Sequence, residues 1–251
     1  MIFKLLSYNI RFGGRERQTQ IAEVINQIKP DLVVFQEASE PEVIKFLSDE
    51  CEMKFWAARR KYSLGFISRN EPEKYEWHHP ERSKHAFLEI QLPNSETRIF
   101  GLHLRARFSK WSERRRHLEI KKLLEAIKAH QHGFHALVGD FNTLAPGEVF
   151  HLELMPLWIR ALIWASGRDI RRDTIQTILD GGYVDGYRKL FPNEKGYTFP
   201  VWQPHVRLDY IFLPEKFADK LLNCEIIKTP PAEIASDHFP LLFHLDLTAN
   251  D

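Results

Sequence analysis

The sequence contains few of the features that would assign it to a class by composition alone. Its 251 residues include only two cysteines, Cys51 and Cys224, and the formal net charge is +1 at pH 7. Neither cysteine belongs to a metal-ligand spacing. Two such thiols fit a reducing compartment, with one disulfide between them as the alternative. A net charge near zero excludes the global basic field of a dedicated DNA-binding protein, so any attraction to an anion must be local.

Long apolar runs are also missing. No stretch approaches the roughly 18 apolar residues that span a membrane. The N-terminal apolar run is broken by Lys4 and ended by Ser7 and Asn9, which makes it too short and too polar for a secretory signal. The sequence has no P-loop, no dinucleotide-binding fingerprint and no Gly-x-Ser-x-Gly elbow. We therefore expect a cytoplasmic protein that uses none of these three chemistries.

The remaining composition is that of a soluble globular protein, with 43% hydrophobic and 27% charged residues. Apolar runs typical of strands alternate with apolar positions at helical spacing, which predicts one α/β domain over residues 1–251. Ser112 is a suitable N-cap for a long helix. We predict strands at 3–8, 32–35, 64–68, 87–92, 98–104, 136–138, 206–213, 225–228 and 241–247, helices at 21–28, 42–47, 112–127 and 147–182, and a turn-rich stretch at 70–80.

Polar residues stand at the ends of several predicted strands. A polar group at the end of a buried strand costs stability unless it is paired or wet. A single case is best interpreted as a cap or turn, but six together indicate a shared site at one sheet edge, where α/β proteins bind ligands. The six places are Asn9, Glu37, His103, the pair Asp140 and Asn142, Asp209, and the run Ser236-Asp237-His238.

The residue types at these places favour metal-assisted hydrolysis. Oxygen ligands such as Glu37, Asp237 and Asn9 suit Mg²⁺ or Mn²⁺, and no cysteine or histidine-pair spacing suggests zinc. Phosphodiester hydrolysis needs a metal for the non-bridging oxygens, an oriented water and charge stabilisation at phosphorus. Two histidines and several carboxylates are suitable groups for that work.

Six segments, in order, resemble the endonuclease/exonuclease/phosphatase superfamily. They are Ser-Tyr-Asn-Ile, Val-Phe-Gln-Glu, Gly-Leu-His-Leu, Gly-Asp-Phe-Asn, Arg-Leu-Asp-Tyr-Ile-Phe and Ser-Asp-His-Phe-Pro. The resemblance covers residues 5–245. It implies a four-layered α/β sandwich, with two facing mixed β-sheets flanked by helices and the site at one end of the sheets.

The resemblance also implies roles for the residues at the strand ends. Glu37 is the expected principal Mg²⁺ ligand (Mn²⁺ is the alternative ion), with Asn9 beside the metal and Asp237 completing the shell. Asp140 is expected to orient or deprotonate the attacking water, and Asn142 to donate a hydrogen bond to the phosphoryl oxygens.

Two histidines complete the expected catalytic set. His238 contacts the phosphate or acts as general base, with its ring fixed by Asp209. His103 lies across the site as a phosphate ligand or proton donor. Whether Asp140 or His238 takes the proton is left open, and Asp185 is as well explained by a structural role as by a catalytic one.

Two branches of the family fit less well than the others. Abasic-site endonucleases have Tyr-x-Pro-Asn where this chain has Gly-Leu-His-Leu-Arg, and often an acidic residue where this chain has Arg11. Inositol 5-phosphatases differ at the segment that here reads Val-Arg-Leu-Asp-Tyr-Ile. His103 is compatible with the deoxyribonuclease, sphingomyelinase, deadenylase and tyrosyl-phosphodiesterase branches.

Two segments bear on the substrate. Residues 105–116 hold six basic groups with interleaved aromatics, which suits a nucleic-acid backbone and an unstacked base; a solvated loop is the alternative. Residues 154–165 are apolar nearly all round a helix, which favours buried packing over a lipid interface. The expected substrate contacts in the first segment are Arg105, Arg107, Trp111 and Arg114.

We therefore predict a Mg²⁺-dependent phosphodiesterase that acts on DNA or RNA, with no obligate protein partner. The alternatives are a phospholipid or sphingomyelin phosphodiesterase and a small-molecule phosphatase. A non-catalytic binding module with the same fold is disfavoured, because no position of the expected catalytic set is replaced.

Overall fold

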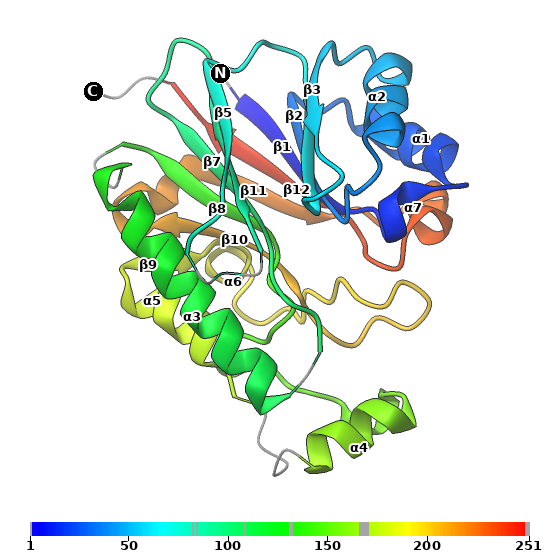
Figure 1. Cartoon of the computed structure of the whole chain (residues 1–251), viewed down its shortest axis with the longest axis vertical. Helices are drawn as coiled ribbons and strands as arrows, with labels where there is room; N and C mark the ends of the chain where they lie inside the picture. Colours follow the sequence, from blue (N-terminus) through cyan, green and yellow to red (C-terminus); the bar gives the residue numbers. More distant parts are fainter. Residues whose placement is uncertain are drawn as a thin grey trace.

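Two six-stranded β-sheets face each other, and helices cover the outer side of each (Figure 1). The computed structural model describes residues 2–81, 83, 85–107, 109–130, 133–165 and 171–248. Within these residues the strands are β1 Ile2–Asn9, β2 Leu32–Gln36, β3 Phe55–Ala58, β4 Leu64–Ser68, β5 Lys74–His78, β6 Phe87–Gln91, β7 Arg98–His103, β8 His135–Asp140, β9 Tyr183–Asp185, β10 Asp209–Pro214, β11 Leu221–Ile226 and β12 Leu241–Asp246. The α-helices are α1 Gln18–Ile28, α2 Pro41–Glu50, α3 Lys110–Ala126, α4 Leu157–Ala165, α5 Asp173–Asp180, α6 Gly186–Leu190 and α7 Pro230–Ala235.

Each sheet has one parallel pair near its centre. Sheet A has the order β11-β12-β1-β2-β4-β3, and sheet B has the order β5-β6-β7-β8-β10-β9. The pair β1 and β2 is parallel, and so is the pair β7 and β8. Parallel register places Asn9 beside Gln36 and His103 beside Asp140, while antiparallel β10 places Asp209 opposite Asp140. The predicted strand-end residues of each sheet therefore share one edge.

Apolar side chains from both sheets fill the space between them. Leu5 and Val34 of sheet A pack in one cluster with Val138 and Ile211 of sheet B. The sheets approach closely where Gly101 faces Val34, because a Cβ at this glycine would lie 2.7 Å from the Val34 side chain. Burial of both faces explains why these strands read as continuous apolar runs.

Helices form the two outer layers (Figure 1). The apolar stripe of α1, which includes Ile25, packs with Phe35 of sheet A, alongside α2 and α7. On sheet B, Leu123 of α3 and Ile175 of α5 pack with Phe100. The predicted four-layer α/β sandwich of two helix-flanked sheets is thereby confirmed.

Three local predictions are wrong. The N-cap of the long helix α3 is Ser109, whose side chain accepts the backbone N–H of Ser112; Ser112 therefore lies inside the first turn. The stretch 70–80, predicted as turns, contains strand β5, whose outward-facing side chains hide its pairing with β6. Residues 147–182 are not one helical region: α4 and α5 lie within it, and residues 166–170 are outside the described residues.

The burial predicted for residues 154–165 is also wrong. Helix α4 projects from the body of the molecule (Figure 1), and Leu157, Trp158 and Trp164 are 77%, 62% and 65% exposed. Its inner side contacts a small apolar cluster through Ile159, and Met155, just before the helix, belongs to that cluster. A helix of nine residues offers this cluster only one face, so its other apolar side chains remain in solvent.

Neither thiol forms a disulfide: Cys51 and Cys224 are free and buried, which removes the alternative of one bridge between them. Within the part of the chain that the structure describes, no helix is both long and apolar enough to cross a membrane.

Candidate active site

Asp140, the last residue of β8, is the centre of a polar cluster at one end of the facing sheets. Its side chain is 1% exposed. Asp140 Oδ2 accepts hydrogen bonds from Asn9 Nδ2 at 3.0 Å and Asn142 Nδ2 at 2.9 Å, and Oδ1 accepts the backbone N–H of Asn142 at 2.8 Å. The preceding residue, Gly139, lets β8 lie close to β7, because a Cβ there would lie 2.0 Å from the Leu102 carbonyl oxygen. Groups from both sheets thus fix one carboxylate.

Two histidines flank this carboxylate. Nε2 of His103 lies 3.8 Å from Asp140 Oδ2, and Nε2 of His238 lies 3.9 Å from the same atom. His238 Nδ1 is 2.8 Å from Asp209 Oδ2, which also accepts the Thr198 hydroxyl at 2.6 Å. The expected Asp209–His238 pairing is present. A carboxylate on Nδ1 fixes the orientation of the ring, so Nε2 of His238 faces Asp140.

Burial and charge give these groups unusual protonation. Burial raises the pKa of Asp140 to about 7, although the neighbouring His238 opposes the rise. Burial by itself lowers the pKa of His238, but the carboxylates of Asp209 and Asp140 outweigh it and raise that pKa to about 10. Burial lowers the pKa of His103 to about 3. At neutral pH His238 is therefore an imidazolium and His103 a neutral imidazole.

The residues predicted as metal ligands lie around a turn that follows β1. Asn9 Oδ1 accepts the backbone N–H of Arg11 at 3.0 Å, and Arg11 Nε lies 3.3 Å from Asp237 Oδ2. Glu37 Oε2 accepts the backbone N–H of Phe12 at 2.6 Å. Glu37 and Asp237 are both half-buried. Because Asn9 also donates to Asp140, this turn is directly joined to the catalytic cluster.

Two sets of side chains are candidates for binding a metal ion. Asp140, Asp209 and His238 have ligand atoms within 4.8 Å of one another. However, Asp209 Oδ2 already accepts the Thr198 hydroxyl at 2.6 Å and pairs with His238 Nδ1 at 2.8 Å, so two of the three side chains are engaged with each other. The half-buried carboxylates of Glu37 and Asp237 offer the hard oxygen atoms that Mg²⁺ prefers. The donor chemistry therefore fits the predicted set better than the cluster with the shortest distances.

The predicted substrate contacts lie on the segment that follows His103. Arg105 is partly exposed and Arg107 exposed, while Trp111 and Arg114 are exposed on the first turns of α3. Arg116, which the sequence groups with them, is 2% exposed and is not a surface cation. Their role in substrate binding remains a prediction.

Arg116 belongs to a buried hydrogen-bond network that the sequence does not predict. It donates two hydrogen bonds to Glu113 Oε2, at 2.8 and 3.0 Å, and two more to the carbonyl oxygens of Arg105 and Arg107, at 2.6 and 3.0 Å. Glu113 Oε2 also accepts the hydroxyl of Thr143 at 2.8 Å. The network therefore ties the segment after His103 to the segment after Asn142. Its members look like ordinary helix-surface residues in sequence, so no pattern identifies them.

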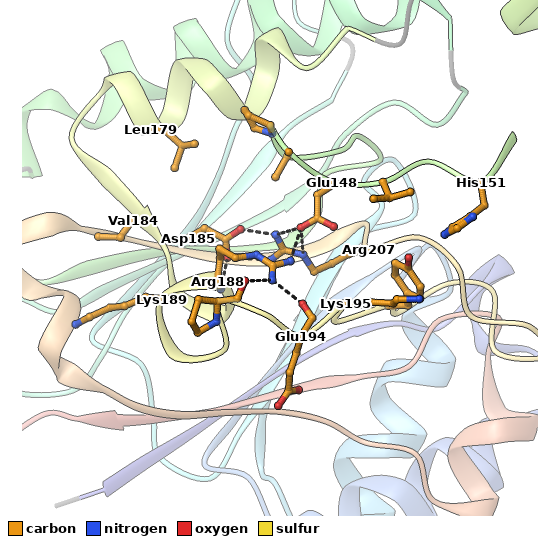
Figure 2. A pocket seen from close by; sticks show the side chains of 16 residues that line it. Glu148, His151, Leu179, Val184, Asp185, Arg188, Lys189, Glu194, Lys195 and Arg207 are labelled. Carbon is orange, nitrogen blue, oxygen red and sulfur yellow. Dashed lines mark hydrogen bonds and ion pairs between the residues drawn. The ribbon is translucent and has the colours of Figure 1, made fainter.

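A second buried network lies beside the site rather than in it. Arg207 donates to Asp185 at 2.5 and 2.9 Å and to Glu148 at 2.7 and 3.2 Å (Figure 2). Asp185 also caps α6 by accepting the backbone N–H of Arg188. These bonds give Asp185 a structural role, and Arg207 anchors the chain two residues before Asp209. The network lines a cavity of about 740 Å³, whose described lining includes no predicted catalytic or metal-ligating residue.

Comparison with known proteins identifies the family. The Endonuclease/Exonuclease/phosphatase family model matches residues 6–238. The chain belongs to this family. Recombination repair protein 1 of Drosophila melanogaster is 27% identical over 179 residues, which make up 66% of this chain and 23% of that protein. The chain therefore matches less than a quarter of the length of that relative.

Solved structures of similar fold cover nearly the whole chain. An AP endonuclease from Archaeoglobus fulgidus has a TM-score of 0.74 at 18% identity, with 98% of this chain and 100% of that chain covered. A 3' phosphatase from Neisseria bound to a product DNA hairpin has a TM-score of 0.72 at 19% identity, with 97% and 99% covered. A 3'-5' exonuclease from Neisseria meningitidis has a TM-score of 0.72 at 18% identity, with 97% and 100% covered.

These comparisons confirm the predicted family and its class of enzyme. Members of the family are phosphoric ester hydrolases such as nucleases and phosphatases, and they typically depend on a divalent metal. The identity near 18% to the solved structures shows the fold alone, so the likeness to an AP endonuclease does not overturn the sequence departures from that branch. A lipid substrate receives no support from the comparisons.

Proposed function

We propose that this chain is a divalent-metal-dependent phosphodiesterase that cleaves DNA. The observation that carries the proposal is the buried Asp140 carboxylate, which lies beside two histidines and accepts a hydrogen bond from Asn9. Asn9 accepts the backbone N–H of Arg11 in the turn whose groups also contact the half-buried Glu37 and Asp237. Buried titratable groups with shifted pKa values gather at catalytic sites, and this arrangement supplies a base, a cation and metal ligands within one cluster.

The chemistry follows from the protonation of the cluster. Glu37, Asp237 and Asn9 would hold a divalent cation, which would supply positive charge to the non-bridging phosphate oxygens. Asp140, with a pKa of about 7, orients the attacking water and accepts its proton, because a base works best when its pKa lies near the operating pH.

The histidines act on the phosphate from two sides. His238 is already protonated at neutral pH, so it serves as a positively charged phosphate contact and not as the base. His103 is neutral and faces Asp140 from the opposite side, where it contacts the phosphate or the leaving oxygen. Asn142 holds Asp140 and donates to the phosphoryl oxygens once substrate displaces one of its bonds. We therefore propose Asp140, and not His238, as the general base.

Three observations favour DNA as the substrate. The Drosophila relative is named as a recombination repair protein, and one structural neighbour is a 3' phosphatase bound to a DNA hairpin. Arg107 and Arg114 are exposed on the segment directly after His103, together with Trp111, which is 65% exposed. Exposed cations with an aromatic suit a phosphate backbone and an unstacked base. A cytoplasmic location is proposed with it, because two free buried thiols fit a reducing compartment.

A substrate panel tests the proposal. Purified protein is assayed with Mg²⁺, with Mn²⁺ and with EDTA on single-stranded DNA, duplex DNA, DNA ending in a 3' phosphate, abasic duplex, RNA, sphingomyelin vesicles and an aryl phosphodiester. Asp140→Asn is the matched control for contaminating nucleases. We expect metal-dependent cleavage of at least one DNA substrate that the control lacks.

Other results would replace the proposal with a named alternative. Preferred cleavage of RNA, of the sphingolipid or of the aryl ester would reassign the substrate and leave the site in place. Cleavage that survives EDTA would remove the metal from the chemistry. Binding of DNA without turnover on any substrate would make the chain a binding module.

A further inference from the structure

The two histidines that flank Asp140 differ on their far sides. His238 Nδ1 is held by Asp209. Among the residues that the structure describes, none hydrogen-bonds to Nδ1 of His103, although this atom is buried. A buried ring nitrogen costs stability unless it is satisfied, by protein or by an ordered water. Nδ1 of His103 therefore needs a hydrogen-bond partner that the protein side chains alone do not supply within the described residues.

A second histidine–carboxylate pair lies behind His103. His85, just before β6, has Nδ1 at 3.3 Å from both carboxylate oxygens of Glu119, which comes from α3. The ring centroids of His85 and His103 are 6.4 Å apart. That separation is too long for a direct hydrogen bond between two imidazoles and suits one intervening water.

A small cavity occupies the space between these groups. Its volume is about 20 Å³, and His85, His103 and Glu119 line it together with apolar side chains that include Leu102 and Leu123. A site of this size holds about one water, and a buried water needs two to four polar partners. Ser83 also lines the cavity, and four polar side chains meet that requirement.

We propose that His85, oriented by Glu119, holds His103 through a water in this cavity and so positions His103 for catalysis. The water donates a hydrogen bond to His103 Nδ1 and is itself held by the His85–Glu119 pair. This keeps the proton on Nε2 of His103, which is directed at Asp140 and the substrate. His85 and Glu119 are positioning residues, and the proposal rests on the proposed function of the cluster.

His103 and His238 are thus held in similar ways by different groups. On one side a carboxylate touches the histidine directly, and on the other a histidine–carboxylate pair acts through water. Partners on the second ring nitrogen set the tautomer and orientation of a functional histidine. His85 and Glu119 stand on different elements from His103, and no motif in the sequence connects them.

The decisive experiment reads the His103 tautomer directly. Protein labelled with ¹⁵N-histidine gives two-bond ¹⁵N–¹H correlations for each ring, and the His103 signals are those lost in His103→Ala. We expect a proton on Nε2 of His103 in the unmodified chain, with Nδ1 as the acceptor. In His85→Ala the two tautomers should mix or the signals should shift. His151→Ala is the matched control, because His151 forms a similar pair with Glu153 away from the site.

Kinetics provide a second reading on whichever substrate the panel identifies. His85→Ala should lower kcat about tenfold with little change in KM, as loss of an outer hydrogen-bond partner typically does. The double variant His85→Ala/His103→Ala should be no slower than His103→Ala alone, because His85 acts only through His103. If His85→Ala does not fold, Glu119→Gln, which keeps the shape and removes the charge, should shift the same signals.

Three outcomes would overturn the proposal. The first is a His103 spectrum that is the same with and without His85. The second is a proton on Nδ1 of His103 in the unmodified chain. The third is a double variant that loses the product of both single effects. Because the spectra need no turnover, they decide this proposal even if the proposed substrate is wrong.

Discussion

The candidate site has a closed half and a more exposed half. The closed half is Asp140 and Asp209 of sheet B with His238, which precedes β12 of sheet A, and the more exposed half is Glu37 and Asp237. Asp140, Asp209 and His238 are 1%, 3% and 5% exposed and bonded to one another or to neighbours on several sides. Glu37 and Asp237 are half-buried, and the exposed cation Arg11 lies against Asp237. The closed half carries the proposed roles in proton transfer and charge stabilisation, and the more exposed half carries the proposed metal ligands.

The largest effect is expected in the closed half. His238→Ala removes the cation beside Asp140 and should lower kcat roughly 10²–10⁴-fold, the usual range for a proton-transfer or charge-stabilising group. The control His244→Ala alters a histidine of β12 that pairs with Glu225 outside the site and should stay near the unmodified rate. A His238→Ala enzyme within a fewfold of normal would remove this residue from the chemistry.

The more exposed half should dominate metal binding. Glu37→Gln should weaken Mg²⁺ or Mn²⁺ binding, measured by calorimetry or manganese EPR, by about 10–100-fold, and turnover should recover partly at high metal. Asp209→Asn should leave the metal dissociation constant nearly unchanged. The opposite pattern would move the ion to the trio of Asp140, Asp209 and His238 and would erase the contrast between the halves.

The arginines of the segment 105–116 should also divide by burial: loss of buried Arg116 should affect stability, and loss of the exposed arginines should affect DNA binding. Arg116→Ala leaves Glu113 as an unpaired buried charge and should lower the free energy of unfolding by about 3–5 kcal/mol. Exposed Arg114→Ala with Arg115→Ala should cost little stability but reduce the salt slope of DNA binding by about 1–2. Urea unfolding and binding titrations at several salt concentrations measure both. An unchanged salt slope would return this segment to the solvated-loop interpretation.

A smaller effect concerns pH and stability in metal-free buffer. A histidine with an ordinary pKa of 6.5 that is raised to about 10 on folding stabilises the folded state fully below pH 6.5, and this contribution is lost as pH rises to about 10. Tm should therefore fall over that window. Asp209→Asn removes the nearest carboxylate and should flatten the decline. Parallel Tm curves for the two proteins would show that His238 carries no such shift.

Much of the fold and of the site can be predicted because it depends on order along the chain. Buried parallel strands give continuous apolar runs, and their polar ends meet at one edge, so Asn9, His103, Asp140 and Asp209 are foreseeable as neighbours. The six ordered segments add the family. The roles of these residues and the single domain over 1–251 remain predictions.

The features that the sequence does not predict depend on contacts between segments that lie far apart along the chain. Thr198 reaches Asp209, and Arg116 reaches carbonyl groups after His103, from positions with no periodic or motif signal. Helix α4 shows a different limit, because a helix apolar all round does not reveal how much partner surface exists to cover it. The pairing of His85 with Glu119 depends likewise on the packing of α3 against sheet B.

The most direct test of the central claim is the rate of DNA cleavage by the unmodified chain and by Asp140→Asn, each with Mg²⁺ and with EDTA. The account predicts that turnover requires the metal and falls by about 1,000-fold or more in the variant, because Asp140 accepts the proton from the attacking water. Circular dichroism should show that the variant is folded. Equal turnover by a folded Asp140→Asn, or undiminished cleavage in EDTA, would contradict the account.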